Sequence, residues 1–124
     1  MEELNHNEEA VMRILWEIER GVLRDILERL PPPPPPYTTV SSIVRLLEKK
    51  GYVGHKAYGK TYEYYPLVTK ATYRKKSFNT LLKNYFEGSA EKVVSFMVKE
   101  KKLKPHEIEE IKKLIAQYDQ NKKS

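Results

Sequence analysis

Residues 37–66 read YTTVSSIVRLLEKKGYVGHKAYGKTYEYYP and combine a helical pattern with a hairpin pattern. In the first half, the apolar residues recur at the spacing of one helix face: Val40, Ile43, Val44 and Leu47. Thr38 or Thr39 is suited to cap this helix, because a threonine hydroxyl can accept a free backbone N–H of the first turn. The pattern therefore predicts a short amphipathic helix that stops at Gly51.

The second half of this segment has the composition of a β-hairpin. Residues 52–57 predict one strand and Thr61–Tyr65 a second, with Tyr58, Gly59 and Lys60 as the connection and Pro66 closing the pair. A two-stranded hairpin is marginal by itself, so it should lie against the helices. A helix that runs directly into a basic hairpin is typical of a winged helix-turn-helix, which is a DNA-reading fold.

The outer face of the predicted helix carries groups that could read DNA. Short hydroxyls lie near its N-terminus and long cations lie further along. In a helix-turn-helix the N-terminal residues of the second helix enter the major groove, where hydroxyls and arginine bind base edges or phosphates. The candidate DNA-binding residues are Thr38, Thr39, Ser41, Ser42, Arg45 and Lys49 on the helix and Lys56, Tyr58 and Lys60 on the hairpin. An ordinary amphipathic helix with a polar outer face is the alternative.

The net charge of the chain is +6, but its positive charge is unevenly distributed. Residues 1–30 carry four Arg and eight Asp or Glu, a balance of −4, whereas residues 37–62 carry five Lys or Arg against Glu48, a balance of +4. A second basic cluster follows at Lys70, Arg74, Lys75 and Lys76. Positive charge gathered around the helix and hairpin suits phosphate binding. Solvated surface lysines are the plainer alternative.

Two helices are expected before this segment. Glu8–Ile18 has apolar residues at helical spacing, and a second helix follows Gly21 with Leu23, Ile26, Leu27 and Leu30 on one face. The run Pro31–Pro36 cannot be helical, so we expect a stiff polyproline II spacer there. Docking of these prolines to an aromatic groove of another protein is an alternative.

The last 56 residues predict three amphipathic helices and no sheet: Thr69–Glu87, Ala90–Lys102 and one that opens at Pro105. Such helices make a poor independent core, so a second copy of the chain is expected to cover their apolar stripes. The expected dimerisation residues are Tyr73, Phe78, Leu82, Tyr85, Phe86, Val94, Met97, Ile108, Ile111 and Ile115. Packing against the N-terminal half is the alternative. The expected fold is mainly α (α+β), with a winged helix-turn-helix domain over residues 1–68 and a helical dimerisation domain over residues 69–124.

Several classes of function are disfavoured. The chain has no cysteine, which excludes disulfides, thiolate metal sites and cysteine nucleophiles. His6, His55 and His106 lack any ligand-like or catalytic spacing, so we expect no metal, no cofactor and no enzymatic activity. The acidic and polar first residues predict no signal peptide, and no apolar run approaches the roughly 20 residues that span a bilayer. We therefore expect a soluble cytoplasmic protein.

The chain contains four sets of short motifs: EAVM (9–12) with ILWE (14–17), TV (39–40) with RLLEKKG (45–51), YEYYPLV (62–68) and GS (88–89). Together they resemble the penicillinase-repressor and methicillin-repressor family of bacterial regulators. The resemblance covers nearly the whole chain. It implies a homodimeric winged-helix repressor on palindromic, double-stranded operators of β-lactamase-type resistance operons. It also implies a membrane-bound sensor protease that cleaves the repressor inside its dimerisation domain.

The family's cleavage point lies between a small polar residue and a phenylalanine, and the matching bond here is Ser95–Phe96. Many relatives carry asparagine at the position of Ser95, and a packing role for Phe96 is the alternative. Copper-responsive relatives bind metal through C-terminal cysteine pairs, which this chain lacks. Two other functions stay open: a winged-helix protein-interaction module that never binds DNA, and a regulator released by direct binding of a small ligand.

Overall fold

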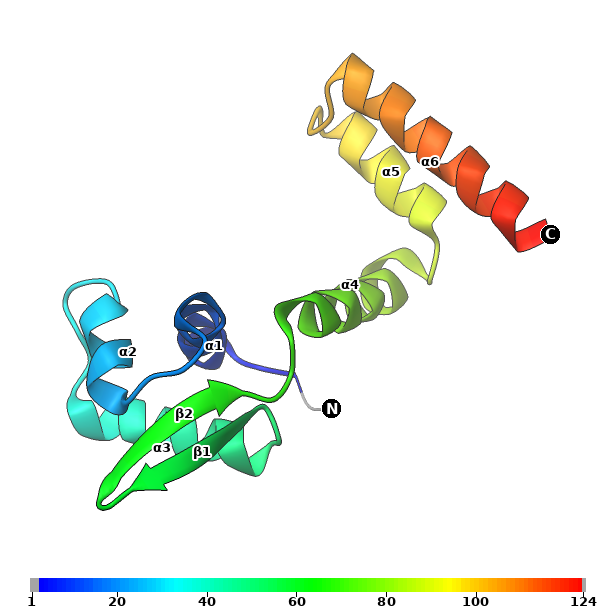
Figure 1. Cartoon of the computed structure of the whole chain (residues 1–124). Helices are drawn as coiled ribbons and strands as arrows, with labels where there is room; N and C mark the ends of the chain where they lie inside the picture. The colour runs from blue at the N-terminus through cyan, green and yellow to red at the C-terminus, as the bar shows by residue number, and fades with distance from the viewer. Residues whose placement is uncertain (1–2, 124) are drawn as a thin grey trace. The chain divides into compact units, whose positions relative to one another are not determined.

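The computed structural model describes residues 3–123, except for the side chains of residue 115 and residues 117–123. The chain divides into two compact units, one up to Ser77 and one from Phe78 onward. Its elements (Figure 1) are α1 (His6–Ile18), α2 (Leu23–Arg29), α3 (Tyr37–Lys49), β1 (Val53–Tyr58), β2 (Thr61–Pro66), α4 (Lys70–Phe86), α5 (Ala90–Lys99) and α6 (Pro105–Lys123). Three helices followed by an antiparallel hairpin confirm the predicted mainly α, winged-helix class. No helix among the described residues is long and apolar enough to cross a lipid bilayer.

The start of α1 is fixed by a reciprocal cap. The Asn5 side chain accepts the Glu8 N–H at 2.8 Å, and the Glu8 carboxylate accepts the Asn5 N–H at 2.9 Å. This capping box satisfies two backbone donors that would otherwise lack partners. It places the first helical residue at His6, two residues before the predicted start at Glu8.

The start of α3 differs from the prediction. Pro36 is the N-cap, and its carbonyl accepts the N–H groups of Thr39 and Val40 at 3.0 and 3.3 Å. The predicted threonine cap is therefore wrong, and both Thr38 and Thr39 lie exposed within the first turn. The proline run also bends at residues 32 and 33, so it is not a straight spacer.

The core of the first unit lies among α1, α2, α3 and the hairpin, which pack on one another. From α3 it takes Val40, Val44 and Leu47, which are fully buried, while Ile43 packs at the edge. Gly51 then turns the chain with φ of +86°, a conformation that side chains with a Cβ rarely adopt. The turn delivers Tyr52 into the core, where its N–H donates to the Leu47 carbonyl at 2.9 Å.

The hairpin is tighter than the prediction. β1 pairs with β2 from Val53↔Pro66 to Tyr58↔Thr61, so Tyr58 belongs to the strand and Gly59 and Lys60 alone form the turn. A positive φ of 63° at Gly59 is what a two-residue hairpin turn requires. The sequence did not predict that Gly21 also pairs with Tyr64, with N–H···O bonds of 2.9 and 2.8 Å. This bridge fixes the hairpin to the α1–α2 connection.

The first turns of α4 belong to the first unit. The Tyr73 ring lies 5.6 Å from Trp16 and 5.9 Å from Tyr52, and its hydroxyl donates to Glu9 at 3.1 Å. Burial, more than any other cause, raises the pKa of Tyr73 above its ordinary value. The Trp16 indole also donates to the Val68 carbonyl at 2.8 Å. Tyr73 is thus a core residue of the first unit, and its role in dimerisation stays a prediction.

This packing gives a test of where the first unit ends. A chain ending at Ser77 is expected to unfold cooperatively, whereas a chain ending at Val68 should be less stable by about 3 kcal/mol, because it lacks the buried Tyr73 ring. Urea unfolding followed by circular dichroism measures the difference. The longer chain carrying Tyr73→Ala is the matched control and should resemble the shorter one. Equal stability of the two fragments would contradict this boundary.

Candidate nucleic-acid interface

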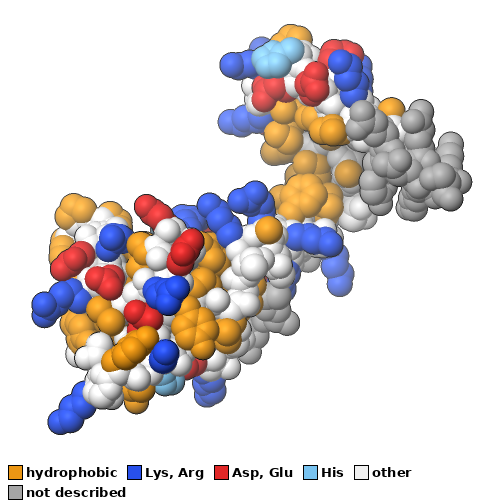
Figure 2. Space-filling model, viewed as in Figure 1, with side chains coloured by type: hydrophobic (Ala, Val, Ile, Leu, Met, Phe, Trp, Pro, Cys, Tyr) orange, Lys and Arg blue, Asp and Glu red, His pale blue; other side chains and the backbone are white. Residues whose placement is uncertain are grey.

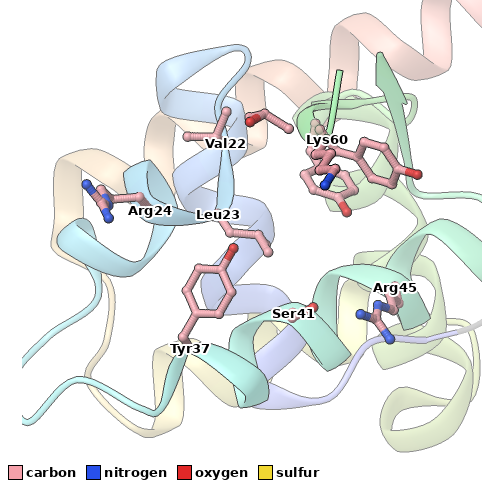
Figure 3. A pocket seen from close by; sticks show the side chains of 10 residues that line it. Val22, Leu23, Arg24, Tyr37, Ser41, Arg45 and Lys60 are labelled. Carbon is pink, nitrogen blue, oxygen red and sulfur yellow. The ribbon is translucent and has the colours of Figure 1, made fainter. Parts of the chain in front are cut away.

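An open groove of about 690 Å³ lies between α3, the hairpin and the start of α2 (Figure 3). We call it the α3–wing groove. Three of its residues, Tyr37, Ser41 and Arg45, follow one another at intervals of four along one face of α3. The full lining is Val22, Leu23, Arg24, Tyr37, Ser41, Arg45, Lys60, Thr61, Tyr62 and Tyr64.

The α3–wing groove is suited to a polyanion. Arg45 enters it from α3 and Lys60 from the hairpin turn, and none of the ten lining residues is acidic. Serine, threonine and tyrosine hydroxyl groups also line the groove and can donate to phosphate oxygens. The Arg24 guanidinium is directed away from the other lining side chains in Figure 3. Arg24 therefore lines the groove mainly with the aliphatic part of its side chain.

The positive field here is smaller than the sequence suggested. Lys50 was counted among the cations, but its Nζ lies 2.8 and 3.0 Å from the two carboxylate oxygens of Glu8. The two side chains are only 15% and 2% exposed. This ion pair ties the N-terminus of α1 to the end of α3 and neutralises the Lys50 charge. Arg45, Lys49, Lys56 and Lys60 remain exposed at the surface.

The structure separates the predicted DNA-binding residues into three sets. Ser41, Arg45 and Lys60 line the α3–wing groove. The others on α3 are exposed beside it: Thr38, Thr39, Ser42 and Lys49. Lys56 and Tyr58 share the opposite face of the hairpin because strand residues two apart point the same way. There the Lys56 ammonium lies 5.3 Å from the centre of the Tyr58 ring, in a hollow that Glu19, Arg20, Glu63 and Tyr65 also line.

Sequence reasoning missed several groove residues. A cap at a threonine puts Tyr37 outside the helix, although its spacing from Ser41 and Arg45 indicates that the three share a helix face. Tyr62 and Tyr64 were assigned only to a strand. Their position on the groove side follows from the register, in which Tyr64 is opposite His55 and Tyr62 is opposite Ala57. Alternation along β2 could have found both.

A cluster around His55 connects the hairpin to α3. Its Nδ1 is hydrogen bonded to the Glu48 carboxylate, and its ring stacks on Tyr62 with centroids 4.4 Å apart. Tyr64 lies 5.9 Å away on the same face. Burial first, and then the Glu48 charge, raise the pKa of Tyr64 above its ordinary value, while Arg45 opposes them. Tyr64 thus responds to the charges of Glu48 and Arg45 on α3.

The second unit carries an apolar groove of about 1000 Å³ between α5 and α6. We call it the α5–α6 groove. None of the described side chains from residue 78 onward is fully buried, and Figure 2 shows apolar side chains gathered on the visible face of this unit. The groove is lined by Ala90, Glu91, Val94, Ser95, Val98, Lys99, Ile108, Ile111, Lys112 and Leu114.

The predicted dimerisation residues of this unit lie at or near its surface. Val94, Ile108 and Ile111 line the α5–α6 groove. Phe78 and Tyr85 are exposed, while Leu82, Phe86 and Met97 are half-buried. The side chain of Ile115 lies outside the described residues. At the predicted cleavage bond, Ser95 is exposed, and Phe96 is half exposed with its ring 5.6 Å from that of Phe86.

No group of three histidine, aspartate or glutamate side chains that could hold a metal ion occurs in the described part of the chain. The two grooves offer surfaces for recognition by charge, hydrogen bonding and apolar contact. The α3–wing groove offers the first two, and the α5–α6 groove offers the third.

The chain is similar to proteins of one known family. The model of the penicillinase repressor family matches residues 4–117. The methicillin resistance regulatory protein MecI of Mammaliicoccus sciuri and that of Staphylococcus aureus strain N315 are each 25% identical over 114 residues, covering 91% of this chain and 93% of the relative. MecI of Staphylococcus aureus strain Mu50 is 24% identical over the same length. The chain therefore belongs to the penicillinase repressor family.

Proposed function

We propose that this protein is a transcriptional repressor that binds palindromic operator DNA as a homodimer and controls antibiotic-resistance-type genes. The observation that carries the DNA-binding part is the α3–wing groove, where Arg45 and Lys60 enter from two elements and no acidic side chain intervenes. Family membership supports repression. The names of the relatives, which regulate methicillin resistance, support the class of genes.

In this proposal α3 lies in the major groove of the operator. Thr38, Thr39 and Ser42 are exposed on its N-terminal half, which is the part that meets base edges in helix-turn-helix proteins. Arg45 reads guanine or holds a phosphate, and Lys60 holds the backbone from the wing. Lys56 and Tyr58 lie on the other hairpin face, so they contact the duplex only if the wing inserts edge-on into the minor groove.

In this proposal the second unit forms the interface between the two copies of the homodimer. An apolar groove of this size, without a fully buried side chain among the described residues of its unit, is expected to gain stability by packing against a second copy. The half-sites of the operator would then lie one helical turn apart, on the order of 34 to 36 Å centre to centre. The first unit thus provides DNA binding and the second provides dimerisation.

Relief of repression is proposed to follow cleavage of the Ser95–Phe96 bond by a membrane-bound sensor protease. The bond lies inside α5, so a cut would divide this helix and detach α6 from its N-terminal part. Both residues contribute exposed surface that a protease could engage after local unfolding. Mass spectrometry of the chain from induced cells should find a fragment ending at Ser95. A chain that stays intact during induction would instead favour release by a small ligand.

Arg45 and Lys60 are expected to act differently in DNA binding. Lys60→Ala should reduce the slope of log affinity against log salt by roughly 0.9 for each phosphate that the lysine neutralises, with the sequence preference unchanged.

Arg45→Ala should weaken binding about tenfold and relax the preference at one base position, because the guanidinium no longer reads a base edge there. Fluorescence anisotropy over a salt series, with matched and substituted duplexes, measures both effects.

The matched control is Lys113→Ala, which removes one exposed lysine from α6 in the second unit. Its salt slope should equal that of the wild-type protein. A Lys60→Ala slope equal to that of the control would remove the wing from the proposed mechanism. Complete lack of retention of any duplex at low salt would favour a protein-interaction module instead.

A further inference from the structure

His55 lies where the recognition helix α3 meets the wing. Its Nδ1 is hydrogen bonded to the carboxylate of Glu48 on α3, and its ring stacks on Tyr62 of β2 at an interplanar angle of 18°. Tyr62 and Tyr64 then form part of the wall of the α3–wing groove. One imidazole thus contacts an acid on the proposed recognition helix and an aromatic side chain on the groove wall.

The charge of this histidine matters because of its neighbour. Glu48 is the one acidic residue in α3, and it follows Arg45 by three positions, so both lie on nearby faces of the helix. A carboxylate without compensation at this place would repel the phosphates that Arg45 and Lys60 attract. A protonated His55 neutralises Glu48, whereas a neutral His55 leaves its negative charge in place.

Few other groups near the cluster can change charge near neutral pH. The titratable groups in contact with His55 are Glu48 from α3 and Tyr62 and Tyr64 from β2. The adjoining groove is lined by Tyr37 and Arg45 from α3, Lys60 from the turn and Arg24 from α2. Of these side-chain types and histidine, only histidine ordinarily changes charge between about pH 5 and pH 8.

We propose that His55 is a positioning residue for operator binding, and that its protonation strengthens the binding. This inference rests on the proposed DNA-binding function. The imidazolium neutralises Glu48 and fixes the Tyr62 wall of the groove against α3. Since nearby phosphates favour the positive form, binding of DNA draws a proton to His55, and operator affinity falls as the pH rises.

The test uses the full chain and a palindromic duplex selected with the wild-type protein. Dissociation constants are measured by fluorescence anisotropy at constant ionic strength. The wild-type protein should bind roughly threefold to tenfold more tightly at about pH 6 than at about pH 8. His55→Gln, which keeps a polar side chain but cannot gain a charge, should bind at both pH values about as the wild type does at the higher one. Glu48→Gln should bind more tightly than the wild type at the higher pH and lose most of the pH dependence.

Two matched variants control for the other histidines. His6→Gln and His106→Gln should keep the pH dependence of the wild type, since both residues are exposed and lie outside the α3–wing groove. A wild-type affinity that does not change with pH would overturn the proposal, as would a His55→Gln variant with the same pH dependence as the wild type. The Glu48→Gln variant gives an independent reading if His55→Gln folds poorly. Failure of the wild type to bind any duplex at either pH would overturn the DNA-binding function itself, which separates the two claims.

Discussion

A Val94→Asp chain is expected to be monomeric and to bind its operator about 100-fold or more weakly than the wild type, because two linked modules no longer bind together. Val94 lies on α5 and lines the α5–α6 groove, which also contains the apolar side chains of Ala90, Val98, Ile108, Ile111 and Leu114. A carboxylate placed there would have to leave water when a second copy packs against these apolar side chains, which is costly. Sedimentation equilibrium measures the oligomeric state, and anisotropy measures the affinity.

The control for this prediction is Val94→Ala, which shortens the side chain without adding a charge. It should remain a dimer and keep most of the wild-type affinity. Binding of Val94→Asp to a single half-site should also stay close to that of the wild type, because the first unit is untouched. A dimeric Val94→Asp chain with wild-type affinity would mean that the α5–α6 groove is not the dimer interface.

Replacing Glu8 by Ala is expected to lower the free energy of unfolding by about 3 to 5 kcal/mol, the usual cost of breaking a buried ion pair from one side. The Glu8 carboxylate is nearly inaccessible and accepts hydrogen bonds from both the Lys50 ammonium and the Asn5 N–H. Without it, the half-buried ammonium loses this counter-charge and α1 loses half of its capping box. Urea unfolding of the full chain, followed by circular dichroism, measures the change.

Glu17→Ala on the exposed side of the same helix is the matched control, and its effect should stay within about 0.5 kcal/mol. Both variants remove one negative charge from α1. The difference between their free energies of unfolding therefore measures the contribution of the buried ion pair and cap. A Glu8→Ala chain as stable as the control would show that the Glu8–Lys50 pair contributes nothing net to the fold.

The local elements of the first unit could be predicted from the sequence because their signals are local. The buried positions Val40, Val44 and Leu47 follow from helical spacing alone, and the hairpin follows from its aromatic and β-branched residues around Gly59. These patterns depend on neighbours within a few residues. They required no knowledge of what the elements pack against.

Contacts between distant residues could not be predicted in this way. Lys50 was read as a surface cation because nothing near it in sequence indicates that Glu8, 42 residues away, lies beside it. Tyr73 fits the apolar stripe of a helix, but periodicity does not say which surface covers the stripe, and Trp16 and Tyr52 of the first unit do so. The choice of partner is a tertiary property that amphipathic spacing leaves open.

The sequence predicts which helix and which hairpin carry the candidate site, but not which of their side chains lie together. The sequence placed the DNA-binding residues on one helix and one hairpin without assigning the two hairpin faces. The strand register then separates Lys56 and Tyr58 from Lys60, and the proline cap adds Tyr37 to the groove. Both outcomes depend on the position of a boundary to within one or two residues, which is where sequence patterns are least informative.

The most direct test of the proposed repressor is selection of binding sites from a random duplex library with the full chain, repeated with Arg45→Ala. The wild type is expected to enrich a palindrome whose half-sites lie about one helical turn apart, with two chains bound to each duplex. Arg45→Ala should lose preference at one symmetric pair of positions in that palindrome. No enrichment by the wild type, or the same motif with the same strength from Arg45→Ala, would contradict the assignment of the α3–wing groove as the DNA-reading surface.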